Sequence, residues 1–173
     1  MRTLVIGGSA SGKSSLAESL AMKSTAPFCY IATMMSQDEE SLVRIKKHQA
    51  MRAQKSFSTV ECYTGLAGLR LPPVGTVLLE CLGNLMANEL FAPEGAGSQA
   101  VESILSGIIV LEAQCLDLIV VTNDVFAGGQ DFQDDTMQYV ETLGMLNREI
   151  SQRFDCVIEV VCGIPIVLNG GTL

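Results

Sequence analysis

The chain has 173 residues, of which 48% are hydrophobic and 17% are charged, and its formal net charge is −8. This length is sufficient for one domain, residues 1–173, with a sizeable hydrophobic core. The acidic balance excludes a general nucleic-acid-binding surface, because contacts to phosphate backbones need a basic footprint. No stretch approaches the run of about 18 apolar residues that spans a bilayer. Without a signal-peptide pattern, the expected location is cytoplasmic, with no membrane insertion.

The first predicted elements are a strand at 2–7 and a helix at 13–22, and the turn between them matches G-x-x-x-x-G-K-S/T. In such a P-loop the backbone N–H groups and the positive end of the helix bind a polyphosphate. The Lys13 side chain reaches the β- and γ-phosphates, and the Ser14 hydroxyl can ligate Mg2+. A simple glycine turn is the alternative, which the readable flanking strand and helix disfavour. The predicted nucleotide-binding residues here are Gly7, Gly8, Ser9, Ala10, Ser11, Gly12, Lys13 and Ser14.

A strand at 28–33 precedes a predicted helix at 37–52, which Ser36 opens with the capping-box pattern S-x-x-E. Residues 44–55 carry five of the eleven basic side chains and no acidic one. The only histidine, His48, shares a helical face with Arg44 and Arg52 at i, i+4 and i+8. Because positive neighbours disfavour imidazolium, we expect a neutral imidazole that can act as a base or nucleophile. A solvated helix face that balances nearby acids is the alternative.

The remaining elements alternate along the chain. They are a short strand near 57–62, a strand at 75–81, helices near 83–91 and 98–115, a strand at 117–123, a helix at 134–153 and strands at 155–162 and 164–168. This order predicts an α/β fold of the P-loop NTPase type, a mainly parallel sheet with helices on both faces. The continuous apolar runs 76–79 and 118–121 are typical of strands buried on both faces, so both belong at the sheet centre.

The six cysteines show no C-x-x-C spacing, and most lie in or beside apolar runs. They are therefore expected to be buried free thiols rather than disulfides or zinc ligands. They are Cys29, Cys62, Cys81, Cys115, Cys156 and Cys162.

Polar residues that end the apolar runs are further candidates, because ligands of open α/β sheets bind beyond the carboxyl ends of the strands. Glu80 is the best candidate for the acid that holds Mg2+ or its water shell, and Asp124 is the second. Either carboxylate could instead cap a following helix. Glu61 is a weaker candidate, with a surface carboxylate as its alternative. The full set of strand-end residues is Gly7, Gly8, Thr33, Glu80, Thr122, Asn123, Asp124 and Gly163.

Together these segments resemble the adenosylcobinamide kinase/adenosylcobinamide-phosphate guanylyltransferase family of cobalamin biosynthesis, nearly end to end. The most specific segment is the string R-I-x-x-H-x-x-x-R at 44–52. The others are residues 7–14, 30–33, 61–62, 78–82, 121–125 and 146–148.

This resemblance implies two reactions at one nucleotide site. In the first, GTP or ATP phosphorylates the hydroxyl of the aminopropanol arm of adenosylcobinamide. In the second, His48 attacks the α-phosphate of GTP, pyrophosphate leaves, and the covalent GMP-histidine passes GMP to the new phosphate to give adenosylcobinamide-GDP. A neutral imidazole suits this chemistry, and the cations implied to neutralise phosphate charge are Arg44, Lys47 and Arg52.

The resemblance also implies the roles of individual residues. Lys13 and His48 are the expected catalytic residues, and Ser14 and Glu80 the expected Mg2+ ligands. A homo-oligomer, a trimer in the family, is expected. Nucleotide contacts beyond the P-loop are implied for Ala32, Thr33, Met34, Gln49, Ala50, Met51, Arg52, Glu61 and Glu80.

The chain departs from the family pattern at two places. Ala10 stands where the family often has arginine, and after Val125 the chain reads V-F-A-G-G-Q-D instead of V-G-x-G-I-V-P. The acid before that valine, usually glutamate, is Asp124. The loop after Val125 is expected to meet the corrinoid or to support the kinase step, so these departures weaken the prediction of the substrate and of the kinase reaction more than that of guanylyl transfer, and they leave open a chain with only one of the two activities. Two other classes also stay open: a P-loop small-molecule kinase that lacks guanylyl transfer, and a non-enzymatic GTP-binding switch.

Overall fold

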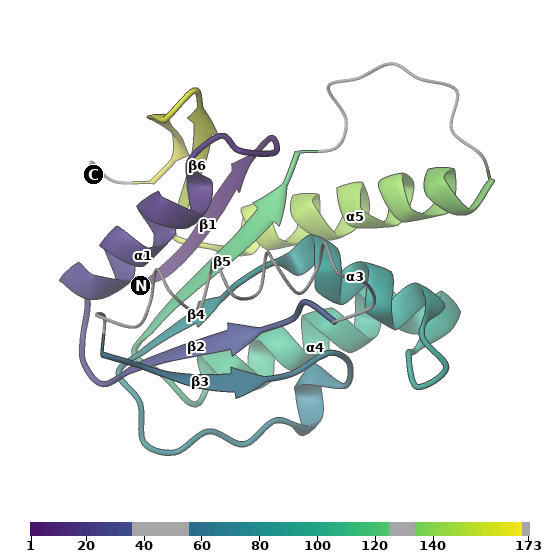
Figure 1. Ribbon diagram of the computed structural model, residues 1–173, viewed down its shortest axis with the longest axis horizontal. Helices are drawn as coiled ribbons and strands as arrows, with labels where there is room; N and C mark the ends of the chain where they lie inside the picture. Colours follow the sequence, from purple (N-terminus) through teal and green to yellow (C-terminus); the bar gives the residue numbers. More distant parts are fainter. Residues whose placement is uncertain (36–55, 125–133, 171–173) are drawn as a thin grey trace.

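The computed structural model describes residues 1–35, 56–124 and 134–170 (Figure 1). These residues contain one seven-stranded sheet in the order β3-β2-β4-β5-β1-β6-β7. Neighbouring strands are parallel throughout, except that β7 runs antiparallel to β6. The predicted mainly parallel α/β fold is confirmed. The strands are β1 (Arg2–Gly7), β2 (Phe28–Ala32), β3 (Phe57–Glu61), β4 (Thr76–Leu79), β5 (Asp117–Asn123), β6 (Cys156–Val161) and β7 (Ile164–Asn169).

The α-helices of the described residues are α1 (Lys13–Lys23), α3 (Leu82–Phe91), α4 (Ala100–Glu112) and α5 (Asp134–Arg153). In Figure 1, α1 lies on one face of the sheet and α3, α4 and α5 lie on the other. Helix α4 is shorter than predicted at both ends, because Gly97–Gln99 forms a separate 3-10 turn before it and the helix ends at Glu112 rather than near residue 115. The predicted helix at 37–52 lies outside the described residues.

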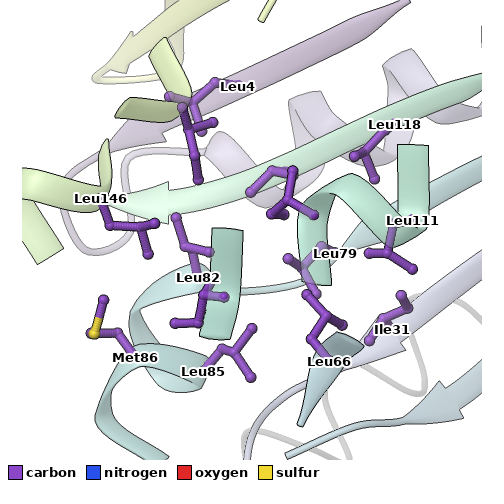
Figure 2. Close-up of a cluster of buried hydrophobic side chains, with 14 of the residues drawn as sticks. Leu4, Ile31, Leu66, Leu79, Leu82, Leu85, Met86, Leu111, Leu118 and Leu146 are labelled. Carbon is purple, nitrogen blue, oxygen red and sulfur yellow. The ribbon is translucent and has the colours of Figure 1, made fainter. Parts of the chain in front are cut away.

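The core divides into two clusters because successive side chains of a strand point to opposite faces. Leu4, Ile31 and Leu79 face α3, α4 and α5 in the larger cluster (Figure 2). Their neighbours Val5, Tyr30 and Leu78 pack against Ala17 and Ala21 of α1. All four residues of β4 are buried, and β4 and β5 lie side by side as the third and fourth strands. The prediction that both strands form the sheet centre is therefore confirmed.

All six cysteines are free, as predicted, but the prediction of burial is wrong for Cys162. Cys162 lies in the turn between β6 and β7, where it has φ +51° and is exposed. The apolar residues before it belong to β6, and the chain leaves the sheet directly after them. Cys81 and Cys115 are half-buried.

Candidate nucleotide site

The P-loop connects the buried end of β1 to the first turn of α1 (Figure 1). Gly7 must be small, since a Cβ there would lie 2.6 Å from Ser11 Oγ and 2.7 Å from the carbonyl oxygen of Val160. Gly12 has φ +95° at the N-cap of α1, a left-handed conformation that glycine adopts without steric cost. Lys13 Nζ donates to the carbonyl oxygen of Gly8 at 3.0 Å. The loop therefore curls over its own lysine.

Two backbone hydrogen bonds fix this loop to neighbouring elements. The N–H of Asp124, at the end of β5, donates to the carbonyl oxygen of Gly7 at 3.1 Å. The N–H of Gly163, in the β6–β7 turn, donates to the carbonyl oxygen of Ser11 at 2.8 Å. Because the two donors lie on opposite sides of β1 in the sheet, the loop is held from both sides.

A cavity of about 350 Å³ opens beside the P-loop at the carboxyl ends of β4 and β5. Parallel α/β folds bind ligands at this edge. Six predicted nucleotide-binding residues line it, and so do Asp124 and Asn123 from the strand-end set. Cys81 and Asn84 were not predicted to contact the nucleotide. The lining residues are Ser9, Ala10, Lys13, Ser14, Met34, Glu80, Cys81, Asn84, Val121, Asn123 and Asp124.

Glu80 is held at the floor of this cavity by its neighbours. It is 9% exposed, and its Oε2 accepts a hydrogen bond of 3.3 Å from the N–H of Thr33. The Thr33 hydroxyl in turn donates to the carbonyl oxygen of Cys81 at 2.8 Å. Thr33 is fully buried, so it supports Glu80 rather than lining the cavity.

The donor set suits Mg2+, because the Ser14 hydroxyl and the Glu80 and Asp124 carboxylates share one cavity. Oxygen atoms are the ligands that Mg2+ prefers, and it commonly uses one or two carboxylates together with substrate phosphates. Within residues 1–35, 56–124 and 134–170, no three His, Cys, Asp or Glu side chains gather as metal ligands. The oxygen atoms of Ser14, Glu80 and Asp124 fit Mg2+ that is held together with substrate phosphates.

A chain of polar contacts connects residues that line the cavity with residues behind them. Thr122 Oγ1 donates to Asn147 Oδ1 at 2.7 Å, and Asn147 Nδ2 donates to the carbonyl oxygen of Asn123 at 3.3 Å. Asn123 Nδ2 lies 3.8 Å from Cys81 Sγ, which also accepts from the N–H of Asn84 at 3.4 Å. Burial raises the pKa of the Cys81 thiol. Cys81 is therefore a neutral hydrogen-bonding group and not a thiolate nucleophile.

Some predicted residues do not line this cavity, and others lie outside the described residues. Glu61 is exposed on the edge strand β3 and accepts a hydrogen bond of 2.8 Å from the Tyr63 hydroxyl. Four strand spacings separate β3 from β1, about 19 Å. Ala32 ends β2 and does not line the cavity. Residues Arg44, Lys47, His48, Gln49, Ala50, Met51 and Arg52 lie outside the described residues.

The helices within the described ranges are all too short or too polar to cross a bilayer.

The chain is similar to known proteins over nearly its full length. Residues 3–168 match the family model described as cobinamide kinase / cobinamide phosphate guanyltransferase. The chain is 32% identical over 177 residues to the bifunctional adenosylcobalamin biosynthesis protein CobP of Pseudomonas aeruginosa, with 100% of both chains covered. It is 32% identical over 183 residues to the bifunctional adenosylcobalamin biosynthesis protein CobU of Salmonella typhimurium, covering 98% of this chain and 100% of that one.

Similarity to solved structures concerns the fold alone. The KaiC-like protein PH0186 from Pyrococcus horikoshii superposes with a TM-score of 0.50 at 15% identity, over 91% of this chain and 71% of that one.

Proposed function

The chain belongs to the cobinamide kinase / cobinamide phosphate guanyltransferase family, and on that premise we propose that both reactions use the P-loop cavity. The chain phosphorylates adenosylcobinamide and then transfers GMP from GTP to the product, giving adenosylcobinamide-GDP. The full-length match to bifunctional relatives carries this function. The cavity between the P-loop and Glu80 supports its location.

In this proposal the P-loop backbone from Gly7 to Ser14 binds the phosphates of GTP, or of ATP in the kinase step. Lys13 contacts the phosphates, and Ser14 and Glu80 hold Mg2+. Mg2+, when bound, offsets the negative charge of the phosphate oxygens. Asp124 lies in the same cavity and is the second carboxylate available for the metal or its water shell. Ala32, Thr33, Met34 and Glu61 remain proposed contacts or supports of the nucleotide.

The guanylyl step runs through His48. An imidazole nitrogen attacks the α-phosphorus of GTP, the bond from that phosphorus to the oxygen bridging it to the β-phosphate breaks, and pyrophosphate leaves. A phosphate oxygen of adenosylcobinamide phosphate then attacks the same phosphorus, and the P–N bond breaks to return the imidazole. Arg44, Lys47 and Arg52 neutralise charge during both transfers, and the stretch Gln49–Arg52 contacts the guanine nucleotide.

Intact-protein mass spectrometry after incubation with GTP and Mg2+ tests the guanylyl half. We expect a GMP adduct on wild-type protein, located on His48 by peptide mapping under mildly alkaline conditions that preserve a phosphoramidate. His48→Ala should lack the adduct and keep the kinase reaction, whereas Lys13→Ala should lose both. An unmodified wild-type protein that binds GTP and still phosphorylates cobinamide would favour the kinase-only alternative. GTP binding without either reaction would favour the switch.

The family resemblance further supports a cytoplasmic homo-oligomer, proposed here as a trimer. Light scattering coupled to size-exclusion chromatography measures its mass directly, and a mass of one 18.5 kDa chain at working concentration would contradict the oligomer.

A further inference from the structure

The exposed face of α3 leads away from the nucleotide cavity. Asn84, Ala87 and Phe91 follow one another at i, i+3 and i+7 on one side of this helix. None of the three is among the buried residues of α3, and Phe91 is 51% exposed. Seven residues of α-helix span about 10 Å. The stripe therefore begins inside the nucleotide cavity at Asn84 and ends on the surface at Phe91.

A second cavity, of about 250 Å³, lies along the outer part of this stripe. Two residues of α3, Ala87 and Phe91, form one wall, and three residues from the first turns of α5 form the other. Asp135 contributes a carboxyl group to this lining. The lining residues are Ala87, Phe91, Asp135, Thr136 and Tyr139.

Tyr139 lines the outer cavity and approaches a residue of the nucleotide cavity. Its side chain lines the outer cavity, while its hydroxyl oxygen lies 2.8 Å from the position that a Cβ on Gly83 would take. The same position is 3.0 Å from Nδ2 of Asn123, a residue of the nucleotide cavity. The absence of a side chain at Gly83 thus leaves room for the Tyr139 hydroxyl near Asn123, so residues of the two cavities lie close together.

At the inner end of the stripe, the amide nitrogen of Asn84 has no hydrogen-bond acceptor among the described residues. This Nδ2 atom is buried. A buried donor without an acceptor is unfavourable, and native structures rarely retain one without a reason. Since Asn84 lines the nucleotide cavity, an oxygen atom of a bound substrate would supply the acceptor.

We propose that the stripe Asn84, Ala87 and Phe91, with Tyr139 of α5, binds the corrinoid acceptor. The inference rests on the proposed function for the identity of the acceptor. The terminal oxygen of the aminopropanol arm accepts from Asn84 Nδ2 beside the phosphates, and the apolar edge of the macrocycle packs on Phe91 and Tyr139. The adenosylcobinamide macrocycle carries a net positive charge, which the Asp135 carboxylate complements.

Equilibrium dialysis of the whole protein against cobinamide, followed by its visible absorbance, tests the outer part of the stripe. Phe91→Ala removes the ring, and Ala87→Leu fills the cavity while keeping a good helix former. We expect each to raise the Kd for cobinamide about tenfold while the KM for GTP stays within about twofold. Ile109→Ala, at an equally exposed apolar residue of α4, is the matched control and should leave both constants unchanged.

Asn84→Leu tests the inner end, and it should raise the KM for cobinamide about tenfold. Asn84→Gln, which keeps the amide donor, should recover part of the loss. Thermal unfolding of every variant separates a local effect from misfolding.

Unchanged cobinamide binding in both Phe91→Ala and Ala87→Leu would overturn the proposal. If the KM for GTP rises instead, the nucleotide occupies the stripe. If the mass of the oligomer changes, a second copy of the chain occupies the stripe. Either result would overturn the proposal. If no GMP adduct forms but Phe91→Ala still weakens cobinamide binding, the guanylyl mechanism fails and the corrinoid site stands.

Discussion

Asn88 Nδ2 donates a hydrogen bond of 2.9 Å to the carbonyl oxygen of Thr33, across 55 residues of chain. The same nitrogen donates to the carbonyl oxygen of Tyr63 at 3.0 Å. One side chain of α3 therefore ties together the segments that follow β2 and β3. Thr33 also donates its N–H to Glu80, so this contact supports the carboxylate at the floor of the nucleotide cavity.

Asn88→Ala should lower the free energy of unfolding by about 1–3 kcal/mol, because two carbonyl groups lose their buried donor. The side chain is 8% exposed, so water cannot readily replace it. Asn88→Asp should be worse, since a carboxylate would face both carbonyl oxygens. Urea unfolding measures the loss. Asn169→Ala, on the exposed edge strand β7, is the control and should stay within about 0.5 kcal/mol of wild type. An unfolding midpoint of Asn88→Ala equal to that of wild type would contradict this account.

Gly7→Ala should destabilise the fold and impair GTP binding together. The new Cβ would lie 2.7 Å from the carbonyl oxygen of Val160, and that oxygen belongs to the backbone of the neighbouring strand β6. Because a sheet backbone cannot move aside as a side chain can, we expect a loss of about 1–3 kcal/mol.

The matched control for Gly7 is Gly68→Ala, where a Cβ meets nothing within 4 Å. Thermal unfolding and fluorescent-nucleotide titration of both variants measure the two effects. If Gly7→Ala binds GTP like wild type, the contact with Val160 does not constrain the P-loop.

The strands and the P-loop could be predicted from sequence because their signals are local. The apolar run before Gly7 and the glycine spacing after it determine strand, loop and helix within a dozen residues. The place of Glu61 could not be predicted, because strand order depends on contacts between distant segments. In the observed order, β3 lies at the sheet edge, which puts Glu61 far from the P-loop although it also ends a parallel strand.

The sequence did not predict that Cys81 and Asn84 line the nucleotide cavity, because this also depends on where the chain turns after a strand. The sequence pattern marks only the last residues of each apolar run as cavity residues, and Glu80 is one of them. The chain turns directly into α3 after Cys81, so the first turn of that helix also faces the cavity. Asn84 lies within one helical turn of the strand end and lines the cavity for that reason. Helix directions beyond that turn depend on packing against the sheet, which the sequence pattern does not specify.

Cys162 should be the one cysteine that reacts rapidly with a thiol reagent in the native protein. It is exposed, whereas Cys29, Cys62 and Cys156 are buried. Burial raises the pKa of the half-buried Cys115 from 9.0 to about 11, so about one thiol in a thousand is ionised there at pH 8. Since the thiolate is the reactive form, labelling of Cys115 should accelerate as the pH rises toward 11.

Timed labelling with peptide mapping measures each site. Cys162→Ser should remove the fast phase and leave the slow phases unchanged. Fast modification of Cys115 at pH 8 would contradict the burial of its thiol.

Substitutions at Ala10 can separate the effect of backbone strain from the effect of an added charge beside the nucleotide cavity. It is exposed, lines the cavity and has φ +56°, a left-handed conformation that is strained for any residue with a Cβ. Ala10→Gly should therefore raise the free energy of unfolding by up to about 1 kcal/mol and leave the KM for GTP unchanged.

Ala10→Arg keeps the backbone strain but adds a cation beside the phosphates, so stability should match wild type. The KM for GTP should fall about two- to fivefold at low salt, because an exposed ion pair contributes up to about 1 kcal/mol. This gain should disappear as added salt screens the charges. Ala113→Arg, at the exposed end of α4, adds the same charge away from the cavity and should not change the KM. Equal KM values for Ala10→Arg and Ala113→Arg at low salt would mean that the side chain at position 10 does not face the phosphates.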